Sequence, residues 1–375
     1  MRWRVFLVVW AFVLGATTLA NAGQVAPHRW AVCGEWRQVT TPETFAFPSD
    51  LAVVSPKEAW LAGYAGDVRG LPVVLHWMGM RWESEVFPTH VAAVDEQVAG
   101  FAVVSSDDVW AVGSWRALGH AHPLVAHWDG TAWSIVKTGM PSLLGGLNSI
   151  AVVPGSEQMV AVGSTAGTSA YGMAIGKTLV LRFDGGRWYR VPSPSPGRAS
   201  QFKDVVVVDG RIWAVGSTED RGGVTRTLTA RNLDGRWRTF VGRLGSLQAV
   251  DAADARHVWV VGPGKDVAPQ RAFIQRWNGI AWTTVRLLGG GTALQDIVVA
   301  SPNDVWAVGY RGGMYDSARP LIMRRNGSTW RGAEAPDVRG PFYAVDGTPH
   351  NLWALSWRVR LGADGPPQLD TFHRC

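Results

Sequence analysis

The chain has 375 residues, a formal net charge of +6 and a charged fraction of only 18%. That fraction, beside 47% hydrophobic residues, excludes an intrinsically disordered chain and leaves enough apolar material for a large buried core. The modest positive charge does not by itself indicate binding to nucleic acid.

The first residues are typical of a secretory signal peptide. A basic start, "MRWR", precedes an apolar run over residues 5–20, and the small residues Ala20 and Ala22 suit cleavage before Gly23. A retained signal anchor is the alternative, although the run is short for a membrane span. We therefore expect a signal peptide over residues 1–22. The mature chain, residues 23–375, should have no membrane span and be secreted, outside the cell or in its envelope, where disulfides persist.

A phrase built around tryptophan recurs seven times along the rest of the chain. It reads "DDVWAVG" at 107–113 and "NDVWAVG" at 303–309, with variants such as "EQMVAVG" at 157–163. Self-similarity at a period of about 50 residues indicates a repeated supersecondary unit. The central positions are Trp60, Trp110, Val160, Trp213, Trp259, Trp306 and Trp353.

Each repeat unit is predicted to contain four short strands. An apolar run such as "DIVVA" at 296–300 precedes the tryptophan phrase, and a third run such as "PLVAHW" at 123–128 follows it. The turn "DGTA" at 129–132 then leads into "WSIV" at 133–136, and Asp-Gly between two such runs is a hairpin signal. Four strands per unit, repeated radially, predict an all-β fold: one seven-bladed β-propeller over residues 23–375.

The abundant tryptophans are predicted to pack between blades rather than to stack on ligands, because large rings fill the wedges between neighbouring sheets. In second strands these are Trp110, Trp213, Trp259 and Trp306, and in fourth strands Trp82, Trp133, Trp188, Trp237, Trp282 and Trp330.

The last repeat lacks its fourth strand. Its third strand, "LDTFHRC" at 369–375, ends the sequence, while "GEWRQV" at 34–39 resembles a fourth strand without a blade. We expect the N-terminal strand to complete the C-terminal blade, which closes the ring and leaves no free sheet edge.

Both cysteines fall at this seam. Aligned on the second repeat, Cys375 takes the place of Asp129 and Cys33 that of Gly130, adjacent residues of one turn. That proximity predicts a disulfide between Cys33 and Cys375, with two free thiols as the alternative.

The "D-V-W-A-V-G … H-W-D-G-x-x-W" repeat resembles that of exported bacterial β-propellers and is loosely similar to the kelch and galactose-oxidase-type superfamily. The resemblance covers about residues 31–375 and implies the fold, but it says little about function. The kelch Gly-Gly doublet is not in register, the sialidase-type Asp box is missing, and no cysteine is spare for a Tyr–Cys cross-link. No catalytic residue, metal or cofactor is therefore carried over.

A basic arc is predicted on one face of the propeller. The loops between second and third strands, from residue 64 to 368, hold more Arg and Lys than Asp and Glu. Such an arc suits an anionic glycan, a cell-wall polymer or an acidic protein surface, whereas a solvated rim is the alternative. The candidate ligand-binding residues share one aligned position: His122, Lys177, Arg226, Arg271 and Arg319.

Three first-strand carboxylates, Asp50, Asp204 and Asp296, share a position near the channel mouth. They could act as acid and base or hold a cation, or they could cap the backbone between neighbouring blades.

Two sets of histidines differ in their expected role. His90, His120 and His122 lie in loops of one face and could bind zinc, but no further ligand is in register. The histidines at one third-strand position are expected to be structural: His76, His127 and His373.

The sequence therefore predicts a secreted, non-catalytic binding module with an anionic partner and without cofactor, metal or nucleic acid. The alternative is a secreted polysaccharide hydrolase or lyase that uses Asp50, Asp204 and Asp296. A purely structural scaffold is a third possibility.

Overall fold

The computed structural model describes residues 34–42, 47–65, 70–166, 176–264, 270–313, 317–348, 350–358 and 368–375. The predicted signal peptide at 1–22 and Cys33 lie outside these residues. Within them the chain folds into β-strands joined by turns and loops, with no α-helix. Accordingly, this part contains no helix long and apolar enough to cross a membrane.

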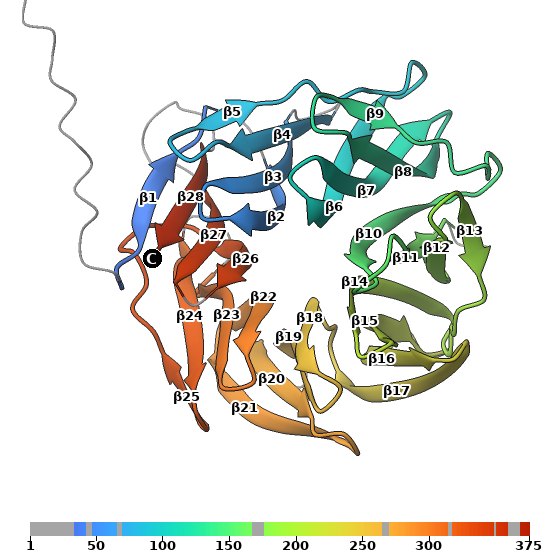
Figure 1. Ribbon diagram of the computed structural model, residues 1–375. Helices are drawn as coiled ribbons and strands as arrows, with labels where there is room; N and C mark the ends of the chain where they lie inside the picture. Colours follow the sequence, from blue (N-terminus) through green and yellow to red (C-terminus); the bar gives the residue numbers. More distant parts are fainter. Residues whose placement is uncertain are drawn as a thin grey trace, which may run out of the picture. The chain divides into compact units, whose positions relative to one another are not determined.

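Seven four-stranded antiparallel sheets form a ring, which confirms the predicted seven-bladed propeller (Figure 1). Blade 1 consists of β2 (Phe47–Ser55), β3 (Glu58–Ala65), β4 (Leu71–Trp77) and β5 (Trp82–Ser84), and blade 2 consists of β6 (Asp95–Ser105), β7 (Asp108–Ala117), β8 (His120–Trp128) and β9 (Trp133–Ile135). Blade 3 consists of β10 (Gly145–Val152), β11 (Met159–Thr165), β12 (Thr178–Phe183) and β13 (Trp188–Val191). Blade 4 consists of β14 (Ala199–Val208), β15 (Arg211–Glu219), β16 (Thr225–Leu233) and β17 (Arg236–Leu244).

The remaining three blades follow the same order except at the seam. They are blade 5, β18 (Ala249–Asp254), β19 (His257–Gly264), β20 (Arg271–Trp277) and β21 (Trp282–Gly290); blade 6, β22 (Thr292–Ser301), β23 (Asp304–Arg311), β24 (Arg319–Asn326) and β25 (Thr329–Gly332); and blade 7, β26 (Phe342–Thr348), β27 (Asn351–Arg358), β28 (Gln368–Arg374) and β1 (Arg37–Thr40).

Strand β1 closes the ring, as predicted. It pairs antiparallel with β28, with Arg37 opposite His373 and Thr40 opposite Asp370, and the two strands lie side by side in Figure 1. Trp36, just before β1, packs with its ring 6.4 Å from that of Trp306 in blade 6. The N-terminal strand therefore supplies both the missing hydrogen bonds and a tryptophan at the seam.

The recurring glycine after "WAV" is explained by a close approach within each blade. At Gly113, a Cβ atom would overlap the carbonyl oxygen of Gln97 in the first strand, beside a register shift between Val98 and Gly100. At Gly309 it would overlap the carbonyl oxygen of Ala293. Glycine at these positions therefore lets the first and second strands meet closely at the bulge.

The second-strand tryptophans fill the wedges between blades. The ring of Trp60 lies 5.0 Å from that of Trp128 and 5.3 Å from that of Trp133, both in blade 2. Trp353 of blade 7 packs equivalently on Trp77 and Trp82 of blade 1. These contacts confirm the structural role predicted for the tryptophans.

Each of these tryptophans also contacts its cross-strand neighbour in the third strand. His76 stacks on Trp60 at 3.9 Å between ring centroids, and His373 lies 4.6 Å from Trp353. This confirms the structural role predicted for His76, His127 and His373. Arginines replace histidine at this position in other blades, and their guanidinium groups lie over the indole of the second-strand tryptophan: Arg231, Arg276 and Arg324.

Candidate functional site

Strand order assigns the loops to two faces. Because each blade is an antiparallel meander, the loops joining second to third strands and one blade to the next emerge on one face, which we call the loop face. The turns joining first to second and third to fourth strands emerge on the opposite turn face. Part of the predicted charge of the loop face lies outside the described residues: the basic Arg69, Lys265 and Arg360 and the acidic Asp67, Asp266, Asp316 and Asp364.

The predicted basic arc occupies equivalent positions, one per blade, from blade 2 to blade 6. Each residue lies at or beside the start of its third strand; for example, Arg226 pairs with Thr218 and Arg319 with Arg311. The register therefore places the arc as predicted, while its role in ligand binding stays a prediction.

The arc residues do not converge on one cavity. Lys177 donates from Nζ to the carbonyl oxygens of Gly197 and Arg198 at 3.1 and 3.0 Å. Arg226 lies 3.9 Å from Asp220, and His122 stacks on Trp115 at 4.5 Å. Lys177 and Arg226 line separate hollows of about 500 and 470 Å³. Arg271 is exposed and Arg319 half-buried on blades 5 and 6.

The three loop histidines are not arranged as a zinc site. Trp115 pairs across the sheet with Glu96 on one side and His122 on the other, and its indole also stacks on His90 at 4.2 Å. His90 Nδ1 is hydrogen-bonded at 2.9 Å to Glu96, a carboxylate only 1% exposed. Among the described residues, no group of three or more His, Cys, Asp or Glu side chains is arranged to hold a metal ion.

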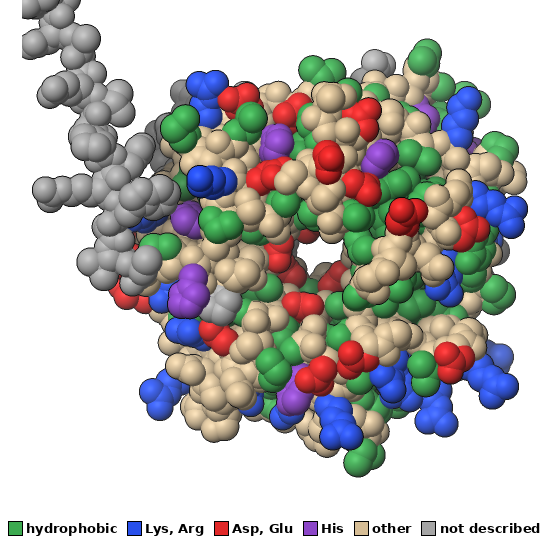
Figure 2. Space-filling view, viewed as in Figure 1, with side chains coloured by type: hydrophobic (Ala, Val, Ile, Leu, Met, Phe, Trp, Pro, Cys, Tyr) green, Lys and Arg blue, Asp and Glu red, His purple; other side chains and the backbone are tan. Residues whose placement is uncertain are grey.

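The first-strand carboxylates line the channel and join neighbouring blades, so the capping interpretation is the correct one. Asp50 accepts a hydrogen bond from the backbone N–H of Phe101 in blade 2, at 2.8 Å. Asp204 and Asp296 accept equivalent bonds from the following blades. Figure 2 shows acidic side chains around the central opening.

Two further aspartates, missed in the sequence, do the same from a position two residues further along the first strand. Asp251 accepts from Val299 at 2.6 Å, and Asp346 accepts from Val53 at 2.7 Å, which links blade 7 to blade 1. The sequence alignment was also one residue out in blade 7, where the register position of Asp50 is held by Ala344 rather than Tyr343.

The channel environment changes the acidity of these carboxyls. Burial raises the pKa of Asp50 and of Asp251 to about 7, against the opposing effect of their backbone hydrogen bonds, and neighbouring carboxylates add to the rise. Burial also raises the pKa of Asp204, Asp296 and Asp346. The cavity lined by Asp50, Asp204 and Asp296 is only about 120 Å³, too small for a sugar ring.

A large cavity lies on the loop face, across blades 2, 3 and 4. This cleft has a volume of about 740 Å³ and holds the charged or titratable side chains Arg116, His120 and Glu219. Glu219 is paired with Arg198, which stands at the cleft's outer edge. Most of the polar lining is hydroxyl or amide: Ser114, Ser164, Thr165, Ser200, Gln201 and Ser217.

The sequence carries a local signal for this cleft. The residue after the repeat glycine is serine in blades 2, 3 and 4, as in "AVGSW" and "AVGST". The same position in blades 1, 5, 6 and 7 carries a larger ring-containing side chain: Tyr64, Pro263, Tyr310 and Trp357. Because three neighbouring blades carry a small serine at this position, space is left there for the cleft.

Comparison with known proteins supports the fold. No protein-family model and no curated protein matches the chain. Among solved structures, the WD40 β-propeller domain of Doa1 matches with a TM-score of 0.56 at 10% identity, over 91% of this chain and 97% of that one. The polysaccharide lyase Uly1 matches with a TM-score of 0.56 at 10% identity, over 91% and 98%.

A protein of unknown function from Dyadobacter fermentans DSM 18053 is also similar, with a TM-score of 0.50 at 13% identity, over 91% of this chain and 98% of that one. At such low identity the likeness establishes the propeller fold alone, because one fold hosts many functions.

Proposed function

We propose that this protein is an exported, non-catalytic binding module that takes up a hydroxyl-rich, anionic polymer, such as an acidic glycan, in the cleft over blades 2 to 4. The observation that carries the proposal is the cleft itself, about 740 Å³ lined by hydroxyl and amide groups. Such groups donate and accept hydrogen bonds in the way that sugar hydroxyls require. Export through residues 1–22 and a Cys33–Cys375 disulfide belong to the same proposal.

Positive charge beside the cleft supports an anionic ligand. Arg116 lines it on blade 2, and a hollow of about 470 Å³ at its blade 4 side is lined by Arg198, Arg221 and Arg226. Glu219 and Asp220 offset part of this charge, and Asp220 also caps the turn at Gly222. Planar guanidinium groups suit the carboxylate or sulfate groups of acidic sugars.

The channel carboxylates do not favour a glycosidase. Asp50, Asp204 and Asp296 each have a carboxylate oxygen bonded to the next blade, around a cavity that a sugar ring does not fit. A hydrolase would instead need two carboxyls facing one open cleft about 5–10 Å apart.

A lyase acting on an acidic polysaccharide is the second candidate. Arg116 and His120 line the same cleft, so an arginine able to neutralise a sugar carboxylate and an imidazole able to accept a proton are both available. The likeness to the polysaccharide lyase Uly1 adds no more than the fold.

Binding is tested by titration calorimetry with polygalacturonate, dextran sulfate and uncharged dextran at low and high salt. We expect the charged polymers to bind, more weakly at high salt, and dextran to bind poorly. Arg116→Gln and Arg226→Gln should weaken binding, whereas Arg187→Gln, an exposed site on the turn face, should not.

Failure of both charged polymers to bind at low salt contradicts the proposal. Ultraviolet absorbance of an unsaturated product, formed from polygalacturonate by the native protein and not by His120→Ala, would favour the lyase instead.

A further inference from the structure

The turn face of blade 4 carries an unusual concentration of arginines. A hollow of about 520 Å³ is lined by Arg231, Leu233, Asp234, Arg236 and Arg238. Arg231 and Arg238 are directly opposite each other across β16 and β17, and Arg211 begins β15 next to them in the sheet. We call Arg211, Arg231, Arg236 and Arg238 the arginine cluster. Like charges facing each other on neighbouring strands destabilise a sheet unless something compensates them.

Five other blades compensate the equivalent cation from within the chain. The base in question is the third-strand His or Arg that lies opposite the second-strand tryptophan. It is hydrogen-bonded to the residue two positions before that tryptophan in the sequence, which we call the acceptor position. In blade 1 this pair is His76 with Glu58, and in blade 2 it is His127 with Asp108. In blade 6, Arg324 makes two bonds to Asp304, at 2.9 and 3.0 Å.

The same acceptor position is also filled in blades 3 and 7. Arg182 donates to Gln158 at 3.4 Å, and His373 bonds to Asn351 at 2.8 Å. Five blades therefore pair the third-strand base with an acid or amide on the second strand.

Blades 4 and 5 depart from this rule, because the acceptor position is Arg211 in blade 4 and His257 in blade 5. Blade 4 alone places an arginine there, so Arg231 faces a permanent cation where its counterparts in five blades face an acceptor. Over the described residues, no side-chain hydrogen bond or ion pair satisfies the guanidinium of Arg231, Arg236 or Arg238. Burial lowers the pKa of Arg231, and repulsion from Arg238 and Arg211 lowers it further.

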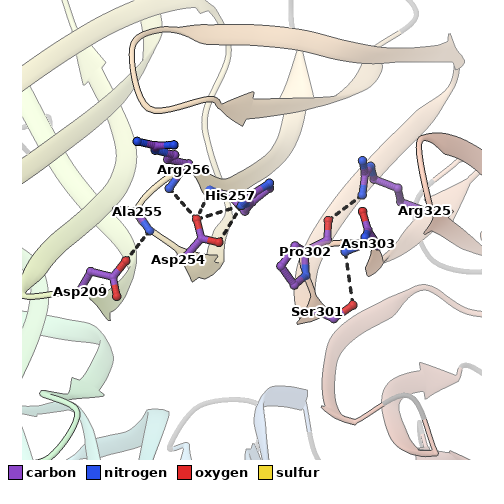
Figure 3. A network of polar contacts seen from close by, with 9 residues as sticks. All are labelled: Asp209, Asp254, Ala255, Arg256, His257, Ser301, Pro302, Asn303 and Arg325. Carbon is purple, nitrogen blue, oxygen red and sulfur yellow. Dashed lines mark hydrogen bonds and ion pairs between the residues drawn. The ribbon is translucent and has the colours of Figure 1, made fainter.

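Asp234 lines the hollow itself, whereas two other aspartates on nearby turns are engaged elsewhere (Figure 3). Asp209 accepts a hydrogen bond from the backbone of Ala255 in blade 5, at 2.8 Å. Asp254 accepts from the backbone of Arg256 and bonds to the His257 ring, at 2.7 Å in each case. These contacts hold both carboxylates in the turns.

Arg231 is held in place by the junction behind it. Its guanidinium lies 5.4 Å from the ring centroid of Trp213 and 5.3 Å from that of Trp277. These contacts fix the orientation of the guanidinium group and reduce the entropy it would lose on binding. Arg236 and Arg238 are exposed beside it.

We infer that the arginine cluster binds a tetrahedral oxyanion, a sulfate or phosphate group, that takes the place of the acceptor present in five other blades. Three or four guanidinium groups around one hollow offer charge-assisted, often bidentate, hydrogen bonds to such a group. The site lies on the face opposite the cleft and does not depend on the function proposed above.

The test uses titration calorimetry of the full chain with sodium sulfate and sodium phosphate, against sodium chloride at equal ionic strength. We expect binding of at least one oxyanion and none of chloride. Dextran sulfate and uncharged dextran, applied to a Ser164→Tyr background that fills the cleft, show whether a polymer-borne ester also reaches the site.

Two sets of variants locate the site. Arg236→Gln with Arg238→Gln removes two exposed donors, and Arg211→Asp rebuilds the acceptor found at Asp108 and Asp304. Each should weaken oxyanion binding by about tenfold or more. Arg187→Gln, a side chain 83% exposed on blade 3, is the matched control and should bind as the native protein does.

Arg211→Asp should also keep or raise the thermal midpoint of unfolding, because it gives Arg231 an internal ion-pair partner. An unchanged or higher midpoint shows that any loss of oxyanion binding in this variant is not caused by misfolding. No response to sulfate or phosphate beyond that to chloride overturns the inference. Unchanged affinity in the Arg211→Asp and double-glutamine variants overturns it as well.

Discussion

Two sides of the ring use the same repeat differently. Where blades 7 and 1 meet, the loop face is filled by rings: Phe47 lies 5.0 Å from both Tyr64 and Trp357, and Asp346 joins the two blades below them. Over blades 2 to 4, serine stands at the position of Tyr64 and Trp357, and the cleft opens.

The contrast extends to the junctions beneath the cleft. Between blades 2 and 3, Gly100 replaces the bridging aspartate and lies close against Ser149. Between blades 3 and 4, Val160 replaces the tryptophan, and Asn148 donates to the carbonyl oxygen of Phe202 at 2.6 Å. One side of the ring keeps the stabilising residues of the repeat, and the other exchanges them for small and polar ones. A repeat fold can thus acquire a binding site by local substitution.

We call the region where blades 7 and 1 meet the filled side of the ring, and blades 2 to 4 the open side. The largest change in stability should come from the filled side, at the seam between β1 and β28. If Cys33 bonds Cys375, Cys375→Ser should lower the free energy of unfolding by roughly 5 kcal/mol, because the bond would close a loop that contains the whole propeller. Denaturant unfolding with and without reductant measures this. Titration of two free thiols in the native protein would contradict the bond.

The aspartates between blades should make stability depend on pH. Because folding raises the pKa of Asp50 and Asp251 from 3.8 to about 7, the folded chain holds protons that the unfolded chain releases. Stability should therefore be greatest near pH 4 and fall as pH rises to 7, by on the order of 3 kcal/mol for each of the two carboxyls. Denaturant unfolding across this range is the measurement.

Asp50→Asn with Asp251→Asn should flatten that pH dependence. Turn carboxylates such as Asp129, whose pKa hydrogen bonds lower to about 2, titrate below this window. His373, whose pKa burial lowers, acts in the opposite sense as a single group. Stability that rises between pH 4 and 7 would refute the assignment.

Removing the indole ring of Trp357 from the filled side should lower the stability of the fold. Trp357→Ser gives blade 7 the residue of blades 2 to 4 and deletes a side chain only 5% exposed, so the free energy of unfolding should fall by about 3 kcal/mol. Thermal and urea unfolding measure the change. An equal loss for Ser217→Ala, on the open side, would erase the proposed distinction.

Filling the open side should affect binding more than folding. Ser164→Tyr places the residue of blade 1 in the cleft, so affinity for polygalacturonate should fall at least about tenfold, or 1.4 kcal/mol, with little change in thermal midpoint. Ser164→Ala is the matched control and should lose much less. Unchanged affinity in Ser164→Tyr would place the ligand elsewhere.

The fold could be predicted from sequence because its signals are local and repeated. The tryptophan phrase, the Asp-Gly turns and the unpaired strand at 34–39 each fix one element, and seven copies fix the ring. The basic arc was aligned correctly for the same reason.

The sites were harder to predict because they depend on contacts between blades. Whether Asp50 is a catalytic acid or a bridge depends on the N–H of Phe101 in the neighbouring blade, which no local pattern shows. The arginine cluster is visible only once β15, β16 and β17 are in register, when Arg211 takes the place that Asp304 holds in blade 6.

The pairing of β1 with β28 also bears on how the protein is made. A ribosome releases the chain from its N-terminus, so the partner of β1 is among the last strands to appear, and the seventh sheet stays incomplete until then. Until that moment β1 and the earlier blades present open edges that can pair with other chains. Deleting β28 should therefore open the ring at the seam and make the protein prone to aggregation and proteolysis.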